Sequence, residues 1–353
     1  MGAPVVSPDL RSILARVAPG TELRDGLERI LRGRTGALIV LGDNDVVESI
    51  CSGGFQLDAD FTATRLRELS KMDGGVVLDA SLRTITRANV QLLPASDIPT
   101  TETGMRHRTA DRVAKQTGFP VISVSQSMSI IALYVEGTRH VLEDSDVIIS
   151  RASQALDTLE RYRTRLDEVL ATLTSLELRG LVTVSDVAVV MQRLEMVIRI
   201  WDEIESYVIE LGIDGRLLKL QLDELVTGLI KDGELVLAEY SRVPPEQVWD
   251  ELDHLTSAQL LEPQLVAAAL GLGGEARGVD QLLPVRGLRL LSKIPRLPSA
   301  VVEELAVHFD SIEDLLSASA ADLQEVEGVG PQRARAIHDG LERLAELTMF
   351  GRR

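Results

Sequence analysis

The spacing of apolar residues changes at about residue 148 of this 353-residue chain, and no other feature constrains the fold as strongly. Before residue 148, apolar runs of strand length alternate with amphipathic segments; the runs are residues 36–41, 74–79, 84–93, 119–126 and 129–135. After it, apolar residues recur every three or four positions, from Leu156 to Leu176 and again from Val187 to Val208. Short runs rich in β-branched residues predict strands, whereas the second spacing predicts long amphipathic helices.

The pattern predicts an α+β multidomain protein in three parts. Helices are expected between the strands, at residues 23–33, 60–72 and 108–118. The predicted parts are a mixed-sheet α/β domain at 1–147, a helical spine at 148–285 and a C-terminal domain of short helices at 286–353. Within the spine, a short helix is expected at 261–271, and breaks between helices are expected at 241–255 and 271–280.

Charge and composition exclude several classes of protein. The net charge of −17 argues against coating nucleic acid by charge alone, so any nucleic-acid site must concentrate its donors locally. No apolar run approaches the roughly 20 residues of a membrane-spanning helix, so no membrane partner is expected. Cys51 is the single cysteine and forms no intrachain disulfide. These features together favour a cytoplasmic location.

The C-terminal domain contains a glycine turn of the helix-hairpin-helix type. In the stretch VEGVGPQRARAIHDGL, residues 326–341, Gly328 and Gly330 form a tight turn and Pro331 opens the next helix. Such a turn can present backbone N–H groups and a helix N-terminus to a DNA phosphate. It can equally serve packing or self-association, and the motif alone does not decide. Arg333 and Arg335, just beyond the turn, favour DNA binding.

A second cluster of basic residues points to a bound phosphate chain. Arg106, His107 and Arg108 follow Gly104, and a helix is expected to begin near Thr109. Loop N–H groups, a helix N-terminus and two guanidinium groups suit a triphosphate. The alternative is a surface basic cluster paired with carboxylates, in which His107 is structural.

An acidic turn adds the second element of a nucleotide site. Asp73 precedes Gly74 and Gly75 at the entrance of a predicted strand. The carboxylate can ligate Mg²⁺ or Mn²⁺, and the glycines let a ligand approach the backbone. Such a triplet alone is usually a plain turn. Combined with the Arg-His-Arg cluster, it indicates phosphoryl or nucleotidyl transfer. The absence of a Walker sequence makes a general ATPase less favoured.

Four stretches carry a family resemblance: SKMDGG (70–75), RANVQLLP (87–94), TGMRHRTADRVAKQTG (103–118) and VISVSQSMSIIALYV (121–135). In order and spacing the chain resembles the bacterial DNA-integrity scanning (DisA) family of diadenylate cyclases over nearly its whole length. The resemblance implies condensation of two ATP into cyclic di-3′,5′-adenylate with release of pyrophosphate. It also implies a homo-octamer with facing cyclase domains, and a C-terminal domain that binds branched DNA such as Holliday junctions.

The resemblance also assigns roles to residues. Asp73 would hold the catalytic Mg²⁺ or Mn²⁺ and help the 3′-hydroxyl to become a nucleophile. Gly74 and Leu92 would offer their backbones to the nucleotide, Leu92 to the adenine. The implied catalytic set is Asp73, Arg106, His107 and Arg108, and the nucleotide-binding set adds Gly74, Gly75, Leu92, Gly104, Met105 and Thr109. The implied DNA-binding residues are Gly328, Gly330, Arg333 and Arg335.

Two positions depart from the family pattern. The family has alanine where this chain has Gly75, and threonine where it has Met105. The second change removes a hydroxyl that could bind phosphate, so slower turnover is expected. It also favours an alternative, a DNA-junction-binding scaffold whose nucleotide site is degenerate and non-catalytic. The intact Asp73 and Arg-His-Arg cluster favour the cyclase.

Overall fold

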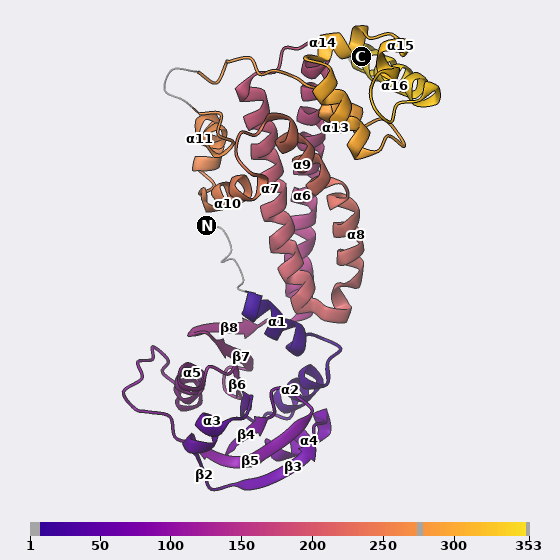
Figure 1. Cartoon of the computed structure of the whole chain (residues 1–353). Helices are drawn as coiled ribbons and strands as arrows, with labels where there is room; N and C mark the ends of the chain where they lie inside the picture. The colour runs from indigo at the N-terminus through magenta and orange to yellow at the C-terminus, as the bar shows by residue number, and fades with distance from the viewer. Residues whose placement is uncertain (1–7, 274–277, 351–353) are drawn as a thin grey trace. The chain divides into compact units, whose positions relative to one another are not determined.

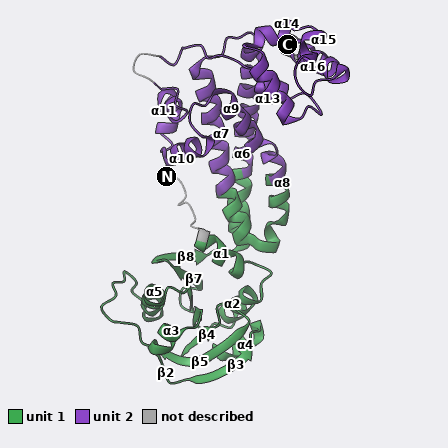
Figure 2. Ribbon diagram, in the orientation of Figure 1, with its two compact units in different colours: residues 1–155, 203–222 green, residues 156–202, 223–353 purple. Residues whose placement is uncertain are grey.

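The computed structural model describes residues 8–273 and 278–350. The chain divides into two compact units (Figure 2). Unit 1 comprises residues 1–155 and 203–222, and unit 2 comprises residues 156–202 and 223–353. The predicted break at 271–280 falls partly outside the described residues.

Unit 1 is built on a mixed eight-stranded sheet (Figure 1). Its strands are β1 (Ala37–Leu41), β2 (Cys51–Ser52), β3 (Phe55–Asp60), β4 (Gly75–Leu78), β5 (Thr84–Leu92), β6 (Val121–Ser125), β7 (Ile130–Val135) and β8 (Thr138–Leu142). The strand order is β2-β5-β4-β1-β6-β7-β8, with β3 also paired to β5. β1 and β4 are parallel and the other pairs are antiparallel. The predicted mixed sheet is confirmed.

Helices cover both faces of this sheet. They are α1 (Pro8–Val17), α2 (Glu22–Arg32), α3 (Asp45–Ile50), α4 (Ala63–Leu69) and α5 (Met105–Thr117). Successive side chains of a strand point to opposite faces, so Ile39 and Val40 of β1 enter different cores. The Ile39 core includes residues of α1, α2 and α4, whereas the Val40 core includes residues of α3 and α5.

Residues 203–222, which the sequence analysis places in the spine, belong to unit 1. They comprise the end of α7 (Val184–Leu211), the short 3-10 helix η1 (Gly212–Gly215) and the first part of α8 (Arg216–Val226). Glu210 pairs with His140 of β8 at 3.2 Å, and Asp214 accepts a 2.9 Å hydrogen bond from Ser145. The predicted boundaries at residues 147 and 285 remain a prediction.

Unit 2 is helical. Besides parts of α6 (Ser145–Glu177), α7 and α8, it contains α9 (Leu229–Tyr240), α10 (Pro245–His254), η2 (Gln259–Leu261), α11 (Pro263–Ala269), α12 (Leu288–Leu291), α13 (Ser299–His308), α14 (Ile312–Ser317), α15 (Ala320–Gln324) and α16 (Pro331–Phe350). The long helices and the short predicted helix near 261–271 are therefore present. The expected break at 241–255 is wrong over most of its length, because α10 occupies Pro245–His254. Within the described part of the chain, no helix combines the length and apolar character needed to cross a membrane.

A buried polar cluster fixes α12 to α6 and α9. Arg289 of α12 donates to both carboxylate oxygens of Glu177, from Nε at 2.7 Å and from Nη2 at 2.6 Å. The hydroxyl of Tyr240 donates to the same carboxylate at 2.8 Å. Glu239 accepts backbone N–H bonds from residues 286, 287 and 289, and so caps the start of α12. The region from α12 onward is thus attached to the long helices by charge as well as by packing.

Candidate active site

The acidic turn and the basic cluster meet at the surface of unit 1. Asp73 lies just before β4 with its side chain fully exposed, and its Oδ1 is 3.2 Å from Nη2 of Arg106. These residues are 33 positions apart in sequence, so the fold brings together the two motifs that the sequence analysis singled out. The contact leaves most of the carboxylate accessible to a ligand.

Gly36, a site residue that no sequence motif indicates, makes room for the Arg106 side chain. A Cβ atom at Gly36 would lie 1.9 Å from Nη1 of Arg106. Any larger residue would therefore displace the guanidinium group from its place beside Asp73. A glycine immediately before a buried strand was the available signal, but its meaning depends on a residue 70 positions away.

The Arg-His-Arg cluster forms the first turn of a helix rather than a loop, which corrects the expected helix start near Thr109. Helix α5 begins at Met105, with Gly104 as its N-cap and a first intrahelical bond from Arg108 N to Gly104 O at 2.8 Å. The N–H groups that precede this bond have no partner within the helix, as at any helix N-terminus. The side chain of Met105 is 86% exposed, and Thr109 donates its hydroxyl to the Met105 carbonyl at 3.0 Å.

His107 differs from its neighbours because its side chain points into the core. It is 5% exposed, and its Nδ1 is 2.8 Å from the hydroxyl of Tyr134 on β7, itself 1% exposed. Burial, and then the nearby charge of Arg139, lower the pKa of His107 below its ordinary value. The imidazole is consequently neutral at pH 7 and adds no positive charge to the cluster. Arg108, by contrast, is exposed.

The glycines of the acidic turn lie against β5. Gly74 donates its backbone N–H to Oδ1 of Asn89 at 3.1 Å, and a Cβ atom at Gly74 would lie 2.3 Å from the backbone carbon of Asn89. Only glycine fits there. A Cβ atom at Gly75 would lie 3.1 Å from the side chain of Leu92, so an alanine needs only a small shift of that side chain. Leu92 is 7% exposed, at the end of β5.

The glycine turn of unit 2 has the geometry of a helix-hairpin-helix. It joins α15 to α16, with Gly328 at φ +83, and a Cβ atom added at Gly330 would meet no atom within 4 Å. Nη1 of Arg333 donates to the carbonyl of Gly328 at 2.5 Å, while Arg335 is exposed on α16. The fold therefore unites Gly328 and Arg333 at the turn.

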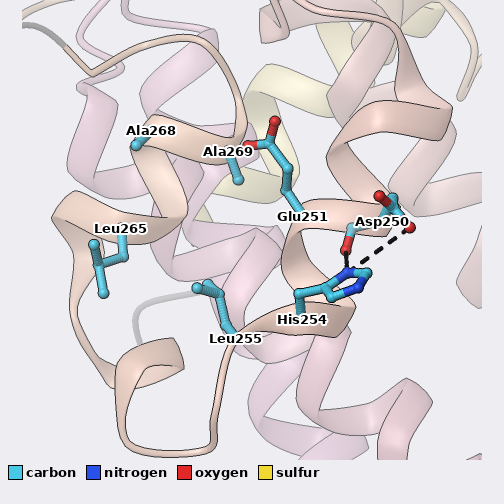
Figure 3. A pocket seen from close by; sticks show the side chains of 7 residues that line it. All are labelled: Asp250, Glu251, His254, Leu255, Leu265, Ala268 and Ala269. Carbon is cyan, nitrogen blue, oxygen red and sulfur yellow. Dashed lines mark hydrogen bonds and ion pairs between the residues drawn. The ribbon is translucent and has the colours of Figure 1, made fainter.

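A further hollow of about 430 Å³ lies in unit 2, lined by residues of α10 and α11 and by Leu255 (Figure 3). His254 donates from Nδ1 to the carbonyl of Asp250 at 2.6 Å, and this bond raises the pKa of His254. None of the residues singled out in the sequence lines this hollow.

Together, a carboxylate on a glycine turn, a basic helix N-terminus and a C-terminal helix-hairpin-helix define the class of a nucleotidyl transferase with a DNA-binding region. Three family models match the chain. DisA bacterial checkpoint controller nucleotide-binding covers residues 24–139, the DisA linker region covers 142–278, and the helix-hairpin-helix motif covers 290–346.

Curated relatives match along almost the whole chain. The DNA integrity scanning protein DisA of Streptomyces coelicolor is 59% identical over 350 residues, which cover 97% of this chain and 94% of that protein. The protein of the same name from Kineococcus radiotolerans is 58% identical over 353 residues, with 98% of each chain covered. The chain belongs to the DisA family of DNA integrity scanning proteins. It is a diadenylate cyclase with a C-terminal helix-hairpin-helix region, which confirms the fold and activity expected from the resemblance.

The similarity to solved structures is low. A hypothetical membrane spanning protein from Bacillus cereus matches with 22% identity and a TM-score of 0.31, covering 35% of this chain and 62% of that one.

Proposed function

We propose that each active site forms where two cyclase domains face each other, each holding one ATP on the surface around Asp73 and Arg106. The 3′-oxygen of one nucleotide attacks the α-phosphorus of the other. An O–P bond forms, the bond to pyrophosphate breaks, and the 3′-hydroxyl proton leaves. The same step in the opposite direction closes the ring. A two-fold symmetric product calls for two nucleotides related by a two-fold axis, which a homodimeric interface supplies.

The Asp73–Arg106 contact carries this proposal. A hard divalent cation such as Mg²⁺ or Mn²⁺ binds one or two carboxylates together with substrate phosphate oxygens, and the exposed Asp73 oxygens fit that mode. When bound, the metal supplies positive charge that stabilises the charge developing on the α-phosphate and pyrophosphate. Arg106 lies beside the Asp73 carboxylate and binds the phosphate chain. Its guanidinium group fits there because Gly36 has no side chain.

The first turn of α5 holds the triphosphate in this proposal. The backbone N–H groups from Met105 to His107 and the guanidinium group of Arg108 bind its oxygens. His107 anchors the turn to β7 through Tyr134, so its role is to position rather than to bind through its side chain. The loss of a threonine hydroxyl at Met105 leaves the backbone donor in place, which supports retained binding with slower turnover.

We also propose that the turn at Gly328 and Gly330, with Arg333 and Arg335, contacts the phosphates of branched DNA such as Holliday junctions. The open space at Gly330 and the helix N-terminus at Pro331 support this role. A homo-octamer, a cytoplasmic location and coupling of DNA binding to cyclase alignment through the helical spine belong to the same proposal.

The test is to incubate the purified protein with ATP and Mn²⁺ and to identify the products by mass. Cyclic diadenylate and pyrophosphate are expected, and Asp73→Asn removes them while the matched exposed variant Asp58→Asn retains them. Products of ADP and phosphate would indicate an ATPase instead. Unreacted ATP, with no rescue by Met105→Thr, would support the non-catalytic scaffold.

A further inference from the structure

Asn89 occupies an unusual place beside the acidic turn. It lies in β5 with φ +54, a left-handed backbone conformation that asparagine tolerates better than most residues. The pairing of β5 with β4 shifts register here, because Val90 faces Gly75 whereas Arg87 faces Val77. Asn89 is therefore part of a bulge, and bulges often redirect a side chain next to a functional site.

Two glycines pack directly against the backbone of Asn89. Cβ atoms at Gly74 and Gly54 would lie 2.3 Å and 2.8 Å from its carbonyl carbon. The Asn89 side chain turns back towards the acidic turn, where its Oδ1 accepts the N–H of Gly74 at 3.1 Å. Asn89 thus touches the residue next to Asp73 through both its backbone and its side chain.

We propose that Asn89 is a positioning residue that sets the place of the Asp73 carboxylate relative to the Leu92 end of β5. The side chain of Asp73 is fully exposed, so apart from its contact with Arg106 its position depends on the backbone of the turn. The hydrogen bond from Gly74 to Asn89 fixes that backbone, and Leu92 lies three residues further along the same strand. This inference rests on the proposed function, in which Asp73 holds the metal and Leu92 lies against the adenine.

Three substitutions separate the side-chain bond from the backbone conformation. Asn89→Gly keeps the left-handed backbone but removes the acceptor, and outer-shell partners of this kind typically contribute about 10- to 100-fold to metal affinity or activity. We expect about a tenfold rise in the half-saturating Mn²⁺ concentration and a similar fall in kcat. Asn89→Asp retains an acceptor and a tolerated backbone, so it needs no more Mn²⁺ than the wild-type protein. Asn89→Ala loses both features and shows the largest defect.

A matched control comes from the neighbouring strand. Asp58 of β3 likewise has a left-handed backbone, with φ +52, and lies at a register shift, although it is exposed whereas Asn89 is half-buried. Asp58→Gly therefore makes the same backbone change without touching the acidic turn. It is expected to retain the wild-type metal requirement. The proposal is overturned if Asn89→Gly matches Asp58→Gly in kcat and Mn²⁺ requirement, or if Asn89→Gly and Asn89→Asp are equally impaired.

A second readout does not depend on turnover. Binding of Mn²⁺ in the presence of a non-hydrolysable ATP analogue, followed by electron paramagnetic resonance, is expected to weaken about tenfold in Asn89→Gly. If the wild-type protein made no cyclic product, the proposed function would fail, and this binding measurement would still decide the role of Asn89. Unchanged Mn²⁺ binding would remove the positioning role even in an active enzyme.

Discussion

Removing the carboxylate of Glu177 is expected to destabilise unit 2 strongly. Glu177 and Arg289 have side chains only 1% and 3% exposed, and the carboxylate accepts two bonds from the guanidinium group and one from Tyr240. Glu177→Gln leaves the charge of Arg289 buried without its counter-charge. Breaking one partner of a buried ion pair costs about 3–5 kcal/mol. With a urea dependence of about 2–3 kcal/mol/M, the unfolding midpoint should fall by about 1–2 M.

Intrinsic tryptophan fluorescence measures this change in unit 2 alone. Trp201 and Trp249 are the only tryptophans of the chain, and both lie in unit 2. Urea titration of tryptophan fluorescence therefore follows the unfolding of that unit. The double variant Glu177→Leu with Arg289→Leu should lose less stability than Glu177→Leu alone, because it leaves no unpaired buried charge.

The matched control is an exposed ion pair on the same helix. Glu168 and Arg165 of α6 lie 2.7 Å apart with side chains 55% and 69% exposed. Glu168→Gln should leave the fluorescence midpoint essentially unchanged, since exposed pairs contribute little. A midpoint for Glu177→Gln no lower than that for Glu168→Gln would refute the reasoning.

Three further predictions concern the nucleotide and DNA sites. Gly36→Ala should lower kcat/KM for ATP by at least about tenfold, because the added Cβ atom displaces Arg106. A tenfold fall corresponds to about 1.4 kcal/mol of lost transition-state binding. Kinetics equal to those of the wild type would contradict this prediction. Gly328→Ala should weaken binding of junction DNA, because the φ of +83 at this position strains any residue with a side chain. A fluorescence-anisotropy titration measures the affinity, and basal cyclase activity should stay unchanged. Equal DNA affinity of variant and wild type would contradict a role of this turn in DNA binding. Since the pKa of His107 lies below its ordinary 6.5, the unfolded chain takes up that proton first. The contribution of His107 to the stability of unit 1 is then complete above pH 6.5 and is lost as the pH drops towards the folded pKa. Residual cyclase activity after heating should therefore fall more steeply with decreasing pH in the wild type than in His107→Gln.

The elements that could be predicted from the sequence are those with a regular pattern of buried residues. Strands β1 and β6 are buried along their whole length, so their apolar runs were plain, as were the long amphipathic helices. Strand β3 was missed because its residues are almost all exposed and half of them are polar, so it forms no continuous apolar run. The start of α5 was also misplaced, because three adjacent basic residues shortly after a glycine are typical of a loop. They instead form the first turn of the helix, with Arg106 and Arg108 exposed and His107 buried.

The residues of the candidate site divide in the same way. Asp73 and Arg106 were found because their chemistry suits a nucleotide wherever they lie. Gly36 and Asn89 could not be found, since their importance depends on contacts across the sheet with residues 70 and 15 positions away. The buried pair of Glu177 and Arg289, 112 positions apart, was invisible for the same reason. Pairing over such separations is decided by the fold and leaves no local pattern.

The composition of unit 1 also bears on how the protein is made. Unit 1 includes residues 203–222 in addition to residues 1–155, so its last part leaves the ribosome well after its sheet. At a synthesis rate of about 5–20 residues per second, the intervening chain takes several seconds to appear. During that time the Pro19 carbonyl and His140 lack the contacts that Ile213 and Glu210 later supply. The nascent unit 1 therefore lacks residues 203–222 during the time in which residues 156–202 of unit 2 are synthesised.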